Sequence, residues 1–133
     1  MGGTSTFTIE QGKIDQDTLR ISDHNATLRV SIFKYRDKDT KQLVCIIPSL
    51  DISGYGENDA KVFEMIEFSL GDFSRFLLEM SHKKRFSFLN NLGWKQQSFK
   101  NKEFSKAFVD VDGNLQDLNA EDNKIERLTL VSA

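Results

Sequence analysis

The longest apolar periodicity in the chain lies between residues 58 and 81. Apolar side chains recur there at steps of three and four residues, and they are Val62, Ile66, Leu70, Phe73, Leu77 and Met80. This spacing places them on one face of an α-helix, while acidic and basic side chains fall largely on the other faces. The pattern predicts one long amphipathic helix over about 58–81 that packs its apolar face on a sheet.

Alternation of apolar and polar residues predicts strands on both sides of this helix. The strands expected before it cover 6–10, 18–21, 26–35 and 42–47. Those expected after it cover 94–99, 104–111 and 125–131. Pro48 should end the strand at 42–47, because proline donates no N–H to a ladder. Strands, then helices, then strands indicate an α+β fold with a mostly antiparallel β-sheet.

A shorter second helix is predicted over about 83–92. Ser81 is a suitable cap at its start, and Gly93 stands where many helices end in a left-handed conformation. For the long helix, either Gly56 or Asn58 can provide the cap. Both helices therefore have recognisable ends in the sequence.

The length of 133 residues fits one domain over 1–133, with a loose N-terminus at 1–5. No apolar run is long enough to span a membrane, and residues 1–10 lack the basic and apolar regions of a signal peptide. We therefore expect a cytoplasmic protein that makes no membrane contact. The single cysteine, Cys45, lies in an apolar strand and is expected to be a small core residue.

Charge is distributed unevenly behind the net value of −2. The segment 81–106 has seven Lys and Arg against one Glu, a formal charge of +6, and the remainder, with 11 basic and 19 acidic side chains, carries −8. Basic residues interleaved with aromatic ones can bind phosphates and stack on bases. The candidate surface consists of Lys83, Lys84, Arg85, Trp94, Lys95 and Lys100. We favour the other interpretation, a solvated lysine-rich face around core aromatics, because the chain has no overall basic excess.

No catalytic, metal-binding or cofactor-binding constellation is evident in the sequence. Neither His24 nor His82 has a carboxylate at a spacing that suggests a dyad. Asp110 and Asp112 lie in a segment that lacks the third acidic position and the closing Glu of a calcium loop. Phosphate-binding loops and the Gly-x-Ser-x-Gly elbow are missing as well. We therefore expect neither enzyme activity nor a cofactor.

The region before the long helix resembles the HicB-like antitoxin family. In that family a strand hairpin leads into a Pro-x-Leu segment, a glycine-containing turn, a capped helix start and an acidic-Ala pair. The corresponding residues here are Pro48, Leu50, Gly54, Gly56, Asp59 and Ala60. The resemblance extends over residues 26–80. It implies a partly RNase H-like α+β sheet, dimerisation, and capture of a small toxin ribonuclease by a domain that does not catalyse.

Two functions of different class follow from these observations. The first is a non-catalytic protein-interaction module, a homodimer that sequesters a small toxin-like basic partner through the acidic residues outside 81–106. The alternative is a nucleic-acid-binding domain that uses 81–106, with Phe86, Phe88 and Trp94 among its contacts. For the alternative we expect at most weak, sequence-independent binding, because no base-reading element is recognisable.

Overall fold

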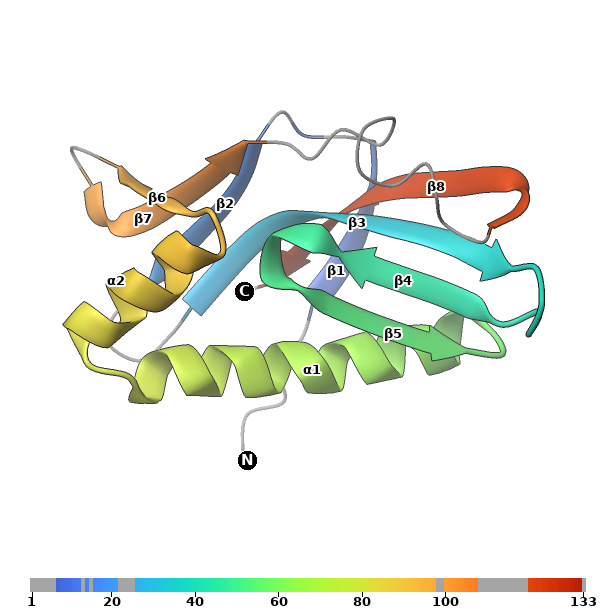
Figure 1. Ribbon diagram of the computed structural model, residues 1–133, viewed down its shortest axis with the longest axis horizontal. Helices are drawn as coiled ribbons and strands as arrows, with labels where there is room; N and C mark the ends of the chain where they lie inside the picture. The colour runs from blue at the N-terminus through green and yellow to red at the C-terminus, as the bar shows by residue number, and fades with distance from the viewer. Residues whose placement is uncertain are drawn as a thin grey trace.

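The computed structural model describes residues 7–12, 14, 16–21, 26–97, 100–107 and 120–132. Side chains are described for these residues apart from 96, 97, 100–107, 120, 122 and 123. The predicted loose N-terminus at 1–5, and the part of the predicted strand 104–111 beyond residue 107, lie outside the described residues. What is described is an α+β fold, as the sequence predicts (Figure 1).

In the described residues, eight strands form one sheet, and two α-helices and a short 3₁₀ helix lie between them along the chain. The strands are β1 (Phe7–Gln11), β2 (Gln16–Ile21), β3 (Ala26–Asp37), β4 (Leu43–Ile47), β5 (Ile52–Gly56), β6 (Lys95–Gln97), β7 (Lys100–Ala107) and β8 (Ala120–Ser132). The helices are η1 (Pro48–Leu50), α1 (Asp59–Glu79) and α2 (His82–Asn91). The two α-helices match their predicted bounds to within two residues at each end. None of the described helices is long and apolar enough to cross a membrane.

The described strand pairings are all antiparallel. The sheet follows the order β1-β8-β3-β2-β7-β6, and β4 pairs with both β3 and β5. One side of β3 pairs with β8, while its other side pairs first with β2 and then with β4. The sheet therefore forks along β3 into two wings, one ending in β6 and the other in β5 (Figure 1).

A buried carboxylate lies at this fork. Arg29 is the last residue of β3 that pairs with β2, and Phe33 is the first that pairs with β4. Ser31 lies between them. The backbone N–H of Ser31 donates to the Asp17 carboxylate at 3.0 Å, and the Ser31 hydroxyl donates to it at 3.1 Å. Buried polar groups need such partners. The backbone ladders of β2 and β4 both stop short of Ser31, so the Asp17 side chain supplies its hydrogen-bond acceptor.

The main core lies between α1 and the sheet. The buried residues of α1 are Val62, Ile66, Leu70, Phe73 and Leu77, and each belongs to the predicted apolar face. They pack in one cluster with alternate residues of β3, which are Ala26, Leu28, Val30 and Ile32. The 3.6-residue period that predicted α1 and the two-residue alternation that predicted β3 therefore also predicted which faces of the two elements meet.

Side-chain caps begin both α-helices. The Asn58 side chain accepts a hydrogen bond from the backbone N–H of Lys61 at 2.9 Å, so Asn58, and not Gly56, is the cap of α1. The Ser81 hydroxyl accepts one from the N–H of Lys84 at 3.3 Å, as predicted for α2. Both bonds satisfy an N–H that has no partner within its helix.

Gly93 ends α2 in the manner that the sequence predicts. Its φ is +96°, a left-handed conformation that glycine adopts without the steric cost of a Cβ. The N–H of Gly93 reaches the carbonyl of Asn90 at 3.0 Å, and the N–H of Trp94 reaches that of Leu89 at 2.9 Å. This pair of bonds is a Schellman motif. It turns the chain so that Trp94 and Leu89 are buried together in the core.

The main error of the sequence analysis lies just before α1. We predicted that Pro48 ends a strand and that a glycine-containing turn follows; Pro48 does end β4, but residues 52–56 form strand β5. Gly54 and Gly56 therefore lie in a strand and not in a turn. The last strand is also longer than predicted, because β8 begins at Ala120. Two glycines in five residues lower strand propensity, which hid β5.

Candidate functional site

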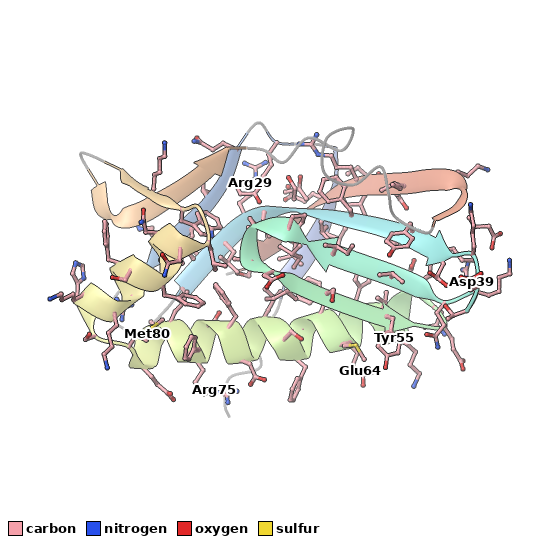
Figure 2. The ribbon with its side chains drawn as sticks, viewed as in Figure 1. Arg29, Asp39, Tyr55, Glu64, Arg75 and Met80 are labelled. Carbon is pink, nitrogen blue, oxygen red and sulfur yellow. The ribbon has the colours of Figure 1, made fainter. Side chains whose placement is uncertain are left out.

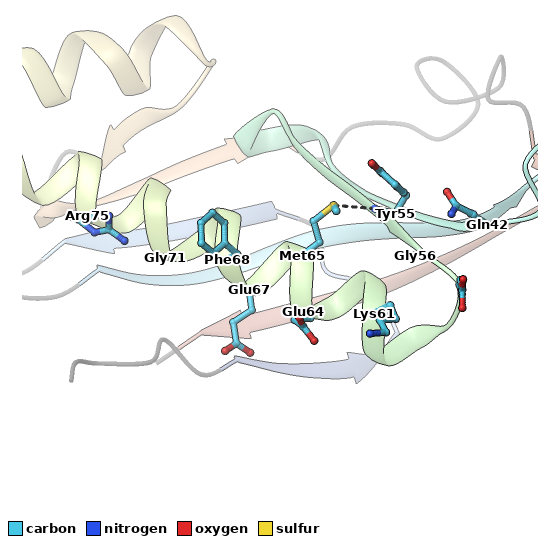
Figure 3. Close-up of a pocket in the computed structure, with 11 residues that line it drawn as sticks. Gln42, Tyr55, Gly56, Lys61, Glu64, Met65, Glu67, Phe68, Gly71 and Arg75 are labelled. Carbon is cyan, nitrogen blue, oxygen red and sulfur yellow. Dashed lines mark hydrogen bonds between the residues drawn. The ribbon is translucent and has the colours of Figure 1, made fainter.

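An open groove of about 880 Å³ runs between β5 and the exposed side of α1 (Figure 3). It is lined by Gln42, Tyr55, Gly56, Glu57, Lys61, Glu64, Met65, Glu67, Phe68, Gly71 and Arg75. They comprise Gln42 just before β4, the end of β5, the loop that follows it, and α1 as far as Arg75. One wall of the groove therefore comes from the segment in which we predicted a turn.

The two glycines of β5 allow α1 to lie directly against this strand. A Cβ atom on Gly56 would lie 2.7 Å from the Lys61 Cβ and 2.7 Å from the backbone nitrogen of Val62. A Cβ on Gly54 would lie 3.2 Å from the Ile66 Cδ1 and 3.3 Å from the Met65 Cγ. Any other residue at position 56 would push the first turn of α1 away from β5. The glycines thus set the width of the groove.

β5 is an edge strand in the described part of the chain, where it pairs with β4 alone. The backbone N–H of Tyr55 points away from β4 and donates to the Met65 sulfur at 3.4 Å (Figure 3). A thioether is a weak acceptor. The outer edge of β5 therefore has a backbone donor that is held only loosely by its own chain.

Large apolar side chains line the groove in exposed positions. Phe68 is 73% exposed, Tyr55 56% and Met65 37%. Removing large apolar side chains from water is favourable, so a cluster of them exposed beside an open groove marks an interaction surface. Phe68 lies on the side of α1 opposite its buried face, and Met65 lies on the flank that meets β5. A helix that only covers a sheet would be polar at both positions.

Three carboxylates beside these apolar groups have no cation bound to them. Among the described residues, none forms an ion pair with Glu57, Glu64 or Glu67. In contrast, Arg75 is already paired with Asp72 at 3.1 Å on the next turn of α1. Figure 2 places Glu64 on α1 close to Tyr55 of the neighbouring strand, and Arg75 farther along the helix. The unpaired charge of the groove is therefore mostly negative.

Asp59, which we predicted at the start of the helix, holds α1 to the sheet. Its carboxylate lies 3.0 Å from the Lys34 ammonium, which also lies 3.5 Å from Glu126 of β8. Burial lowers the pKa of Lys34, but the hydrogen bond to Asp59 and the charges of both carboxylates outweigh it and raise the pKa above 10.5. This cluster is structural, since it links β3, β8 and α1.

The predicted basic surface is only partly available. Lys83 and Lys84 are exposed at the start of α2. The guanidinium of Arg85, however, donates to the carbonyl of Leu77 at 2.8 Å and to that of Met80 at 3.2 Å. Arg85 therefore caps the end of α1, where the Leu77 carbonyl also accepts from the N–H of Met80 at 3.3 Å.

Trp94 does not lie on the surface. It is 1% exposed, and its indole N–H donates to the carbonyl of Ser49 at 2.9 Å. A base cannot stack on this ring without unpacking the core, so Trp94 is not part of an exposed binding surface. It is a core aromatic, as the interpretation that we favoured supposes. Lys95 is exposed, and the side chain of Lys100 lies outside the described part of the structure.

Cys45 is a core residue, as predicted, and has no accessible surface. Burial raises the pKa of its thiol to about 12, and the nearby Lys34 only partly opposes this. The described residues contain no group of three or more His, Cys, Asp or Glu placed to hold a metal ion. The groove, in contrast, combines exposed apolar groups with unpaired charge.

Sequence reasoning missed every apolar residue of the groove. The signal that could have found them was the presence of Met65 and Phe68 outside the apolar face of α1, together with Tyr55 between two glycines. Comparison of the chain with protein-family models, with curated proteins and with solved structures finds no match.

Proposed function

We propose that this protein is a non-catalytic protein-interaction module that holds a small, basic partner protein in the groove between β5 and α1. The observation that carries the proposal is the groove itself, where Tyr55, Met65 and Phe68 are exposed beside the unpaired Glu57 and Glu64. Interfaces bury aromatic residues and methionine at their centre and place charged groups at the rim. The role agrees with what the resemblance to HicB-like antitoxins implies.

Nucleic-acid binding remains the alternative, and we rank it second. Of the residues expected to carry it, Trp94 is buried and Arg85 caps the end of α1. This leaves Lys83, Lys84 and Lys95 as the described exposed cations of the predicted surface. Three lysines with Phe86 as the exposed aromatic of the predicted surface support only weak, salt-sensitive contact with phosphates.

A site-specific cross-linking experiment tests the proposed function. A photo-reactive phenylalanine analogue is placed at position 68, in the groove, or at position 86 on α2. Phe86 is the matched control because it is also an exposed phenylalanine, at 43%, but lies outside the groove. We expect a protein to be cross-linked in the native cell from position 68 and not from position 86.

The cross-linked protein is then identified, purified and titrated with the wild-type protein and with Phe68→Ser. We expect a one-to-one complex that Phe68→Ser weakens about tenfold, since a Phe contact is worth roughly 1.5–3 kcal/mol. Phe86→Ser should bind as the wild type does. Equal cross-linking from both positions, none from either, or a complex indifferent to Phe68→Ser would each contradict the proposal.

A further inference from the structure

We propose that the groove binds its partner by strand addition: an extended, basic segment of the partner pairs antiparallel with the outer edge of β5. This inference rests on the proposed function and specifies the form of the partner. Its elements are the unpaired edge of β5, the apolar wall formed by Met65 and Phe68, and the carboxylates beside them.

The orientation of the β5 backbone follows from two observations. Tyr55 is opposite Val44 of β4, yet its N–H points outward to the Met65 sulfur. In an antiparallel pair, hydrogen-bonded and non-hydrogen-bonded positions alternate. The N–H and C=O of Ser53 must therefore point outward too, whereas those of Gly54 face β4. A partner strand would thus pair with Ser53 and Tyr55.

Strand addition improves the hydrogen bonding of this edge. At present the Tyr55 N–H bonds to a thioether, which a partner carbonyl would replace with a stronger acceptor. The released Met65 side chain is flexible and can repack against the incoming segment. Main-chain bonds of this kind supply the affinity in strand-addition complexes, while pockets for alternate side chains supply the specificity.

Side-chain alternation defines the chemistry of the partner segment. Gly54 and Gly56 face α1, whereas the side chains of Ser53 and Tyr55 are exposed on the other face. Partner residues opposite the glycines would therefore point towards Met65 and Phe68, and these should be apolar. The remaining partner positions would point to the face of Tyr55, away from α1. The unpaired carboxylates near this edge create a negative field that attracts positive charge, so these positions should be basic.

A second copy of this chain fits the β5 edge poorly. Two-fold pairing of β5 with its copy would set the strands about 4.8 Å apart. Packed helices, however, need about 8–10 Å between their axes. The glycines allow α1 to lie directly against β5, and Met65 of α1 contacts the outward N–H of Tyr55 at the edge of this strand. The two copies of α1 would therefore collide. A strand without an accompanying helix avoids this collision.

A synthetic peptide tests the inference with the intact protein. The probe is a fluorescent peptide of about seven residues, within the usual length of a strand, in which valine and lysine alternate; a valine–glutamate peptide is the charge control. Two further isomers have N-methyl groups on all the lysines or on all the valines. If valines face α1, the lysine amides point at β5, so lysine methylation should abolish binding and valine methylation should spare it.

The protein side of the test uses one amide and two variants. We expect the Tyr55 amide proton of the wild type to shift downfield in the NMR spectrum as the peptide binds. Phe68→Ser should weaken binding about tenfold and Phe86→Ser should not. Tyr55→Pro should also weaken binding severalfold through loss of the N–H, and proline is tolerated at an outward-facing edge position.

The outcomes separate this inference from the proposed function. If both methylated isomers bind alike, if the valine–glutamate peptide binds equally well, or if the Tyr55 amide does not move, strand addition is refuted. A native partner that is cross-linked at position 68 would then still uphold the protein-binding function. Self-association that Tyr55→Pro abolishes would show that a second copy occupies the edge, and would refute the inference as well.

Discussion

Lys34 connects three elements through a single ammonium group. Its contacts with Asp59 and Glu126 join β3 to the start of α1 and to β8, and the ring of Phe63 lies 5.8 Å away. The lysine side chain is 16% exposed, so solvent screens this cluster less than an ordinary surface pair. The contribution of Lys34 to stability should therefore depend on its protonation.

Replacement of Lys34 by methionine is expected to lower the free energy of unfolding by about 1 kcal/mol at neutral pH. Because the folded pKa lies above the unfolded value of 10.5, this contribution is complete below pH 10.5 and disappears as the pH rises through the folded pKa. Urea unfolding of wild type and Lys34→Met at several pH values measures the difference. Lys38→Met, at an exposed turn, is the control; a gap that stays constant above pH 10.5 would contradict the assignment.

Cys45 should be inert to alkylation while the protein is folded. Its thiol has no accessible surface and a pKa of about 12, so the reactive thiolate is both shielded and scarce. We expect no labelling by iodoacetamide at about pH 8.5, the ordinary pKa of a thiol, and rapid labelling in concentrated urea. Mass spectrometry measures both. Labelling of the native protein at the rate of the unfolded one would show that β4 is not buried.

At the scale of elements, the contact between β5 and α1 depends on two glycines of unequal importance. The Cβ of an alanine at position 56 would meet backbone atoms of α1, which cannot move independently. At position 54 it would meet the ends of the Ile66 and Met65 side chains, which can rotate. The two substitutions are chemically identical, so they form a matched pair.

We expect Gly56→Ala to destabilise the protein by roughly 2–3 kcal/mol and Gly54→Ala by about 1 kcal/mol or less, following the cost of overpacking. Chemical unfolding of both variants measures the difference. Equal effects at the two positions, or a larger effect at position 54, would mean that α1 does not approach β5 as closely as described.

The elements that the sequence predicted well are those with a single strong period. The apolar face of α1 and the alternating face of β3 each pack on one neighbour, so the pattern and the core coincide. β5 was not predicted because the positions that face α1 are the glycines Gly54 and Gly56. They make room for the helix, but they do not produce the alternation of apolar and polar residues that indicates a strand. The groove was missed with it, because its donor is a backbone N–H of Tyr55, which no residue type reveals.

The basic segment left two interpretations open in the sequence, a binding surface and a solvated face around core aromatics. Its composition suggested one surface, but packing assigns Trp94 to the core and Arg85 to the end of α1. Indole and guanidinium groups have both apolar and polar parts, so either can serve a core or an interface. Sequence alone could not decide between these roles, because the deciding partners, Ser49 and Leu77, lie on separate elements.

At the scale of the whole molecule, three strands of the described sheet have a partner on one side only: β1, β5 and β6. β1, near the N-terminus, is such an edge, whereas β8, near the C-terminus, lies between β1 and β3. Exposed edges invite association unless they are short or covered. β6 has three residues and β5 has α1 at its side, which leaves β1 as the edge best suited to a copy of the chain.

We therefore expect a two-fold dimer through β1. Light scattering at micromolar concentration should give twice the chain mass of 15.2 kDa. Tyr55→Pro should not change this mass, because it alters a different edge. A mass of 15.2 kDa would rule out the dimer without affecting the β5 groove.

The pairing of β1 with β8 also determines when parts of the chain can fold. Phe7 lies opposite Ser132, so this ladder must close nearly the whole chain, whereas β3, β4, β5 and α1 follow one another closely in sequence. Closing a long loop costs more entropy than closing a short one, and contacts distant in sequence slow folding. We expect β1 to dock last, so that Ile9→Ala accelerates unfolding and leaves the folding rate nearly unchanged in stopped-flow measurements.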